Sequence, residues 1–137
     1  MYRTIIVAID ATAPEKADRI VPRAKALLQE GGELVLLAVV EDLPGYVLAE
    51  VPVNITLDAR KEAEAVLTGL RNQFDVPTAK IEVRLGAPAR EILSSADHHK
   101  ADLIILASHR PDLSNYFLGA TADRIVRHAQ CSVLVDR

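Results

Sequence analysis

The sequence predicts an α/β fold in which a five-stranded parallel sheet carries helices on both faces. Strand-like runs alternate with helical patterns along the chain, in the order βαβαβαβαβ. Four of these runs are continuously apolar, as expected of strands that are buried on both faces of a parallel sheet. Right-handed crossovers between such strands place helices on both faces. The four runs are Thr4–Ile9, Leu34–Val40, Leu103–Ala107 and Val133–Val135.

A fifth run has a different pattern and predicts an edge strand. In the segment Ile81–Leu85, the apolar residues Ile81, Val83 and Leu85 alternate with the charged residues Glu82 and Arg84. Strict alternation indicates a strand buried on one face only. Charged residues at a sheet edge also discourage pairing with other chains, so we expect this strand to lie outermost.

Helical patterns fill the gaps between the strands. Thr12 and Glu15 have the spacing of a capping box before the first helix, and Gly31-Gly32 are expected to end it. Pro22 lies inside the same pattern and is expected to kink it. Later helices are expected around residues 59–74, from Pro88 to Lys100, and from about Thr121. Their predicted inward residues are Ala17, Ile20, Val21, Ala24, Leu27 and Leu28, then Ala59, Ala63, Val66, Leu67, Leu70 and Phe74, then Ile92, Leu93 and Ala96, and finally Ile125, Val126 and Ala129.

Length and composition are ordinary for one globular domain covering residues 1–137. The net charge of −3 offers no basic stripe, so we expect no nucleic-acid partner. Cys131 is the single cysteine, which excludes an internal disulfide, and we expect it to be buried and inert. The beginning of the sequence lacks the apolar region of a signal peptide, and no run is long enough to span a bilayer. We therefore expect a cytoplasmic protein without a membrane partner.

Open parallel sheets bind ligands beyond the carboxyl ends of their strands, so the residues that follow each strand are the candidates. Asp10 follows the first strand, and the segment from Ser108 to Gly119 leads from the fourth strand to the last helix. A glycine at a helix N-terminus favours an anion such as phosphate, and His109 and Arg110 add donors. The alternative is a plain connector in which Gly119 is a turn residue.

Four motifs of the chain together are typical of a known family. They are VAIDAT around Asp10, LGAP at Leu85–Pro88, the segment LIILASHRPDLSNYFLGATADRIVRHA, and CSVLV at the last strand. The sequence resembles the universal stress protein family over its whole length. The resemblance implies strand order 3-2-1-4-5 in a Rossmann-like, adenine-nucleotide α-hydrolase-like fold, and it implies binding of ATP with Mg²⁺.

The resemblance also implies where the nucleotide lies, between the ends of the first and fourth strands. Asp10 would bond the ribose hydroxyls or hold Mg²⁺, since a carboxylate otherwise repels a triphosphate. The alternative is that Asp10 is a helix N-cap or a surface residue. Val39 would meet adenine through its backbone, which is compatible with a core side chain. The implied binding residues are Ala8, Ile9, Asp10, Val39, Ala107, Ser108, His109, Arg110, Gly119, Ala120 and Thr121.

The nucleotide motif departs from the family pattern. Ala107 stands where the first glycine is expected, Arg110 falls near the second, and the loop is one residue shorter. Ala120 replaces a Ser or Thr, although Thr121 follows directly. Loss of a hydroxyl hydrogen bond to a charged phosphate costs about 1.5–3 kcal/mol, or roughly 10- to 100-fold in affinity.

Two functions remain open. The first is an ATP-binding stress protein with slow or no hydrolysis, because the sequence offers no catalytic residue or metal cluster that we would assign. The second is a nucleotide-free protein-interaction module on the same fold. P-loop and dinucleotide-binding glycine motifs are absent, and the acidic residues of a receiver domain and the phosphate loop of a flavin protein are missing as well.

The last strand, Ser132–Asp136, predicts a homodimer or a higher oligomer. The strand order implied by the resemblance leaves it at an edge, and it carries no internal charge or proline. Two copies would pair antiparallel about a two-fold axis, with Val133 and Val135 on one face of the sheet and Leu134 on the other. Elsewhere, His98-His99 are expected to be solvated or to face the helix dipole, and His128 to be structural.

Overall fold

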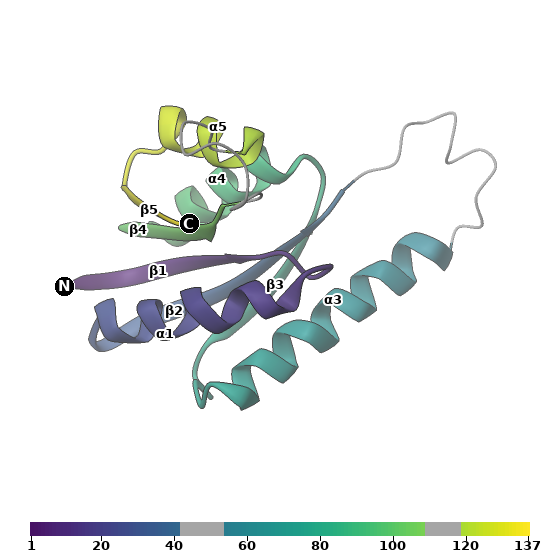
Figure 1. Cartoon of the computed structure of the whole chain (residues 1–137), viewed down its shortest axis with the longest axis horizontal. Coiled ribbons are helices and arrows are strands. Elements are labelled where there is room, and N and C mark those ends of the chain that lie inside the picture. The colour runs from purple at the N-terminus through teal and green to yellow at the C-terminus, as the bar shows by residue number, and fades with distance from the viewer. Residues whose placement is uncertain (42–53, 109–118) are drawn as a thin grey trace.

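The computed structural model describes residues 1–41, 54–108 and 119–137, with side chains from residue 57 onward in the second range. The chain order alternates strands and helices as the sequence predicts (Figure 1). The elements are β1 (Tyr2–Ile9), the 3-10 helix η1 (Pro14–Lys16), α1 (Ala17–Leu27), β2 (Leu28–Val40), α3 (Asn54–Gln73), β3 (Lys80–Leu85), α4 (Pro88–His99), β4 (Leu103–Ala107), α5 (Ala120–His128) and β5 (Ser132–Asp136).

The five strands form a parallel sheet in the order β3-β2-β1-β4-β5, which confirms the expected fold class. In the middle of the sheet, Val7 of β1 pairs with Leu36 of β2 on one side and with Ile105 of β4 on the other. The beginnings of β1 and β4 are also joined, because the carboxylate of Asp102 accepts hydrogen bonds from the Arg3 and Thr4 N–H groups at 2.9 and 2.8 Å.

Alternation along the strands divides the core into two layers. Ile5, Val7 and Ile9 pack in one buried cluster with α1 and α3, whereas Ile6 packs in a second cluster with α4 and α5. Figure 1 shows the corresponding helices as pairs on opposite sides of the sheet. In the part of the chain that the structure describes, no helix has both the length and the apolar composition needed to cross a bilayer.

The two ends of α1 differ from the prediction. The capping box does not form, because the Thr12 hydroxyl donates instead to Asp10 Oδ1 at 2.6 Å, and α1 has no side-chain cap. Gly31-Gly32 do not end the helix either, since α1 ends at Leu27 and β2 runs through both glycines. Pro22 lies inside α1 with its ring exposed.

The two glycines lie in a β-bulge, where the pairing of β1 with β2 is irregular. The register shifts between Tyr2, which pairs with Leu28, and Thr4, which pairs with Glu33. Extra residues on one strand of a pair produce a bulge, and Gly31 supplies the positive φ, +78°, that such a bulge requires. The glycine pair was therefore assigned to the wrong structural role.

Strand β3 lies at the sheet edge as predicted, but its charged residues do not face solvent freely. Helix α4 covers them, so that the Glu82 and Arg84 side chains are only about 20 % exposed. Arg84 Nε lies 2.6 Å from Glu82 Oε1, and Arg84 Nη1 lies 3.3 Å from Glu91 Oε1 on α4. The charges that we expected to protect the edge thus form a network beneath α4.

His99 belongs to the same network, so of the two expected roles, a solvated ring or a ring that faces the helix dipole, the solvated one is wrong for this residue. Its ring is 12 % exposed, and Nε2 lies 2.6 Å from Glu82 Oε2 while Nδ1 lies 3.6 Å from Glu33 Oε1. His98, in contrast, is exposed. Another inward assignment also fails, because Val126 of α5 is 48 % exposed and the helix buries Ala122 and Ile125 instead.

Acid should destabilise the protein through Glu82. Burial opposes the charged form, but hydrogen bonds, the largest from His99 and smaller ones from Ser95 and Arg84, lower the pKa of the Glu82 carboxyl from 4.5 to about 2. Because this folded-state pKa is depressed, the stabilisation is present above about pH 4.5 and is lost as the pH falls towards 2. The free energy of unfolding, measured with urea, should fall more steeply over this pH range for wild type than for Glu82→Gln. Glu62→Gln, an exposed change on α3, serves as the control and should follow wild type. Parallel pH profiles for wild type and Glu82→Gln would contradict the assignment.

Two glycine substitutions should change stability in opposite directions. A Cβ at Gly32 would lie 2.7 Å from the Arg3 carbonyl oxygen and 2.9 Å from that of Gln29, and these backbone atoms cannot move without disturbing the β1–β2 pairing. We expect Gly32→Ala to lower the free energy of unfolding by about 1–3 kcal/mol. A Cβ added at Gly69, which is exposed on α3, would have no atom within 4 Å. Gly69→Ala should therefore raise the free energy of unfolding by about 0.5–1 kcal/mol. Denaturant unfolding measures both, and a Gly32→Ala variant as stable as wild type would contradict the bulge interpretation.

Candidate functional site

The carboxyl ends of β1 and β4 lie side by side and bring together residues that the sequence places far apart. Ala8 of β1 pairs with Leu106 of β4, so Asp10 and Ser108 follow two neighbouring strands at one edge of the sheet. From β1 the chain crosses to β2, on the other side from β4. The two strands therefore flank the point where strand order reverses, which is where open parallel sheets bind ligands.

Asp10 is exposed at this edge and shapes the turn that follows β1. Its Oδ1 accepts hydrogen bonds from the Thr12 N–H at 2.9 Å and from the Thr12 hydroxyl at 2.6 Å. The Asp10 carbonyl oxygen accepts the Ala13 N–H at 3.0 Å. Asp10 stabilises this turn but is not a helix N-cap, because the N-cap residues of η1 and α1 are Ala13 and Lys16. Both of these Thr12 hydrogen bonds to the Asp10 carboxylate use Oδ1.

The strand residues of the predicted site offer mainly backbone. Ile9 is 6 % exposed and packs in the cluster of α1 and α3. Ala8 and Val39 are half-buried and pack on the α4 and α5 side. Ala107, the last residue of β4, is half-buried as well. These side chains belong to the core, so contact with a ligand at the edge would be made through main-chain atoms, as expected for Val39.

Helix α5 begins at the same edge and has no side-chain cap. Gly119 is its N-cap residue, and Ala120 and Thr121 form the first turn. The N–H groups of a first turn have no partner within the helix, and the macrodipole makes this end positive. Gly119 has φ −61° and ψ 159°, which any residue can adopt. Its missing side chain therefore matters for access to the backbone rather than for conformation.

The loop that joins β4 to α5 is described only at its ends. Ser108 is 6 % exposed, and its N–H donates to the Asp136 carbonyl oxygen at 2.7 Å. His109 and Arg110, two of the predicted site residues, lie outside the described residues. The structure thus brings together Ala8, Ile9, Asp10, Ala107 and Ser108 at adjacent strand ends. Val39 lies near the end of the neighbouring strand β2, and Gly119, Ala120 and Thr121 lie at the start of α5.

Two arginines near this edge were missed by the sequence analysis. Arg19 and Arg23 of α1 place their Nε atoms 3.0 Å from the two carboxylate oxygens of Asp136, which is 8 % exposed. Asp136 also receives the Ser108 N–H, so the two guanidinium groups lie beside the end of β4. Both arginine side chains are about half exposed, and two guanidinium groups with one carboxylate leave a net charge of about +1 at this place. Their spacing of four residues was visible in the sequence, but their common partner was not.

A small apolar hollow lies at the ends of β2 and β3, on the side of α3. It has a volume of about 160 Å³. Val40 and Val83 form its base, and the exposed side chains of Leu57 and Leu85 form its rim with Arg60. Val40 follows Val39, so the hollow belongs to the same edge of the sheet as the residues above. Among the described residues, no group of three or more His, Cys, Asp or Glu side chains could hold a metal ion.

Solved structures with the same architecture include several stress proteins. The universal stress protein UspA from Lactobacillus plantarum is 28 % identical, with 99 % of this chain and 98 % of that chain covered and a TM-score of 0.76. A universal stress protein solved in complex with cAMP is 20 % identical, with 99 % and 97 % covered and a TM-score of 0.66. At this lower identity the similarity shows a common fold.

Sequence comparison extends the similarity to the whole chain. Universal stress protein G from Escherichia coli O157:H7 is 32 % identical over 146 residues, and the alignment covers both chains completely. The family model described as the universal stress protein family matches residues 1–137. Together with the strand order and the arrangement of β1, β4 and α5, these matches show that the chain belongs to the universal stress protein family.

Proposed function

We propose that this protein binds ATP together with Mg²⁺ at the carboxyl edge of the sheet, between β1 and β4. The observation that carries the proposal is the start of α5 at Gly119, which has no side-chain cap. This helix follows β4, the strand that pairs with β1, and β1 leads to Asp10. Backbone N–H groups at a helix start suit phosphate oxygens. The stress protein solved with cAMP, which has the same fold, supports an adenine nucleotide as the ligand.

Each part of the nucleotide has a partner in this proposal. The N–H groups of Ala120 and Thr121 receive phosphate oxygens, and the Thr121 hydroxyl takes the role that Ala120 cannot fill. Asp10 Oδ2 accepts from the ribose hydroxyls or contacts Mg²⁺, for which carboxylate oxygen is a suitable ligand. Val39 meets the adenine ring through its backbone. Donors from His109 and Arg110 complete the phosphate site.

We expect hydrolysis of ATP to be slow or absent. Transfer of a phosphoryl group to water needs a residue that positions or deprotonates the water. Asp10 is the carboxylate of the proposed site, and its Oδ1 is already engaged by the N–H and hydroxyl groups of Thr12. We therefore do not expect this oxygen to position a water molecule for attack on the phosphate. The role that fits this arrangement is a nucleotide-dependent stress protein, with turnover far below the typical enzyme value of about 10 s⁻¹.

A nucleotide-free interaction module is the second candidate function. Ala107 and Ala120 support it, because each stands at a position where the family motif has a residue that favours phosphate. In either case we propose that residues 1–137 act as one domain. We also propose that it works in the cytoplasm, where ATP is abundant.

Substitutions at Gly119 and Asp10 should weaken ATP binding. A valine side chain at Gly119 would block the approach of phosphate to the backbone, and Asp10→Ala would remove the ribose or Mg²⁺ contact. Calorimetry with ATP and Mg²⁺ should show an affinity loss of about tenfold or more for Gly119→Val. Asp58→Asn, an exposed change on α3, should bind like wild type.

The outcomes separate the two candidate functions. Wild-type affinity in both Gly119→Val and Asp10→Ala would exclude the proposed position of the nucleotide. Failure of wild type to bind ATP, AMP or cAMP at millimolar concentration, with no nucleotide released on denaturation, would favour the nucleotide-free module. Circular dichroism shows whether each variant remains folded.

We propose in addition that two copies associate through β5. This strand is the outermost one beside β4, and Val133, Leu134 and Val135 are half-buried. Leu134 packs in the cluster of α1, and Val133 and Val135 pack in the cluster of α4 and α5, as the alternation predicts. Among the described residues no strand pairs with the outer side of β5, so this side can offer backbone hydrogen bonds to a second copy.

Proline at Val133 should weaken such a dimer, because it removes a backbone donor from the outer side of β5. The main-chain groups of Ser132 and Asp136 bond to the β4 side, so the Val133 N–H, which alternates with them, faces away from β4. Val133→Ala serves as the control, since it loses side-chain packing but keeps the N–H group. Light scattering at about 50 µM should find dimers for wild type and Val133→Ala, and mainly monomer for Val133→Pro. A monomeric wild type at this concentration, or a Val133→Pro variant that is folded and fully dimeric, would contradict the proposal.

A further inference from the structure

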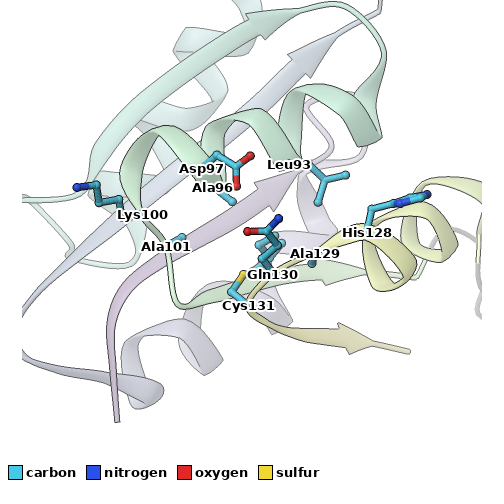
Figure 2. A pocket seen from close by; sticks show the side chains of 10 residues that line it. Leu93, Ala96, Asp97, Lys100, Ala101, His128, Ala129, Gln130 and Cys131 are labelled. Carbon is cyan, nitrogen blue, oxygen red and sulfur yellow. The ribbon is translucent and has the colours of Figure 1, made fainter.

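A cavity at the opposite edge of the sheet has no part in the proposed nucleotide site. Its volume is about 350 Å³, and it lies between the last turns of α4 and the turn that joins α5 to β5 (Figure 2). Ala101 precedes β4 and Cys131 precedes β5, so the cavity adjoins the beginnings of these two strands, whereas the proposed nucleotide site lies at the end of β4. The length of a five-residue strand, roughly 17 Å, separates the two places.

The walls of the cavity combine an apolar base with four polar side chains, those of Asp97, Lys100, His128 and Gln130. Leu93 and Ala96 of α4, Ile104 of β4 and Ala129 form the apolar part. Figure 2 shows the side chains of Asp97, from α4, and Gln130, from the turn below it, extending into the space between these two elements. Such a base with a few polar groups is the composition of a small-molecule site, and the volume is at the lower end of the usual range.

Two helices end at this cavity, and their carbonyl ends contribute negative partial charge to one side of it. Helix α4 ends at His99 and α5 ends at His128, so the carbonyl ends of both macrodipoles, roughly −0.5 charge each, lie here. The Asp97 carboxylate adds a full charge, and within the described residues no ion pair or hydrogen bond involves its side chain. Lys100 also lines the cavity, but in Figure 2 its ammonium group points away from Asp97 and Gln130.

Cys131 serves as an apolar part of the wall. Its side chain lines the cavity and is half-buried. Burial, followed by the charges of Asp102 and Asp97, raises the pKa of its thiol. A protonated thiol is a weak nucleophile, so Cys131 contributes contact area here rather than reactivity.

We propose that this cavity binds a small organic cation, a primary ammonium group carried on a compact apolar body. The ammonium group donates to the Asp97 carboxylate and to the Gln130 side-chain oxygen, next to the carbonyl ends of α4 and α5. The apolar body packs against Leu93, Ile104 and Ala129. This site is independent of ATP, since it shares no residue with the carboxyl edge of the sheet.

Three probes of one shape test the charge that the cavity prefers. They are 2-phenylethylamine, 2-phenylethanol and phenylacetate, titrated into the protein while its amide resonances are followed by NMR. We expect the amine to bind with saturation and to shift resonances around residues 96–101 and 128–131. The alcohol should bind about fivefold more weakly, and the acid more weakly still.

A substitution on the wall and a matched control complete the test. Asp97→Asn keeps the shape of an exposed side chain, so folding should be unaffected, and it should reduce the affinity for the amine about fivefold. Asp58→Asn, on α3 and away from the cavity, should leave it unchanged. The proposal is overturned if the acid binds as tightly as the amine, if Asp97→Asn binds the amine like the control, or if no probe reaches saturation at tens of millimolar.

Discussion

The central strand β1 is buried on both faces and paired on both sides, and the placement of the other elements depends on this burial. Ile5, Ile6 and Val7 are completely inaccessible to solvent, while β2 and β4 pair with the strand along its two sides. A strand with two apolar faces is stable only when a helical layer covers each face. The same burial fixes the edge at which β1 ends, and Asp10 is the first polar residue beyond it.

The sequence allowed the order of the elements to be predicted because four of the strands contain continuously apolar runs, although β2 begins at Leu28 and not at the predicted Leu34. Thr4–Ile9 and Leu103–Ala107 have no polar face that could lie in water, so an interior parallel sheet was the natural interpretation. The strand order came from family resemblance, since alternation of strands and helices is compatible with several orders. Asp10 and Gly119 could be placed in a candidate site because residues that follow parallel strands meet at one edge.

The contacts that the sequence did not reveal are long-range and polar. His99 lies seventeen residues from Glu82, and their hydrogen bond depends on how α4 crosses β3. Asp136 meets Arg19 and Arg23 only because α1 packs over β4 and β5, which no local pattern specifies. The capping box failed for a related reason, since Thr12 has a closer acceptor in Asp10 than in the start of a helix. Residues of this kind have several possible partners, and tertiary packing selects among them.

The pairing of β1 with β4 also affects how the chain folds. Thr4 and Asp102, which join the beginnings of these strands, are separated by 98 positions in the chain. During synthesis β1 can pair with β2 early, but its other side has no partner until β4 leaves the ribosome. An apolar strand with one open side is a site for association with other chains. The late closure of so large a loop costs entropy, so we expect slow folding in which formation of the β1–β4 ladder is the limiting event.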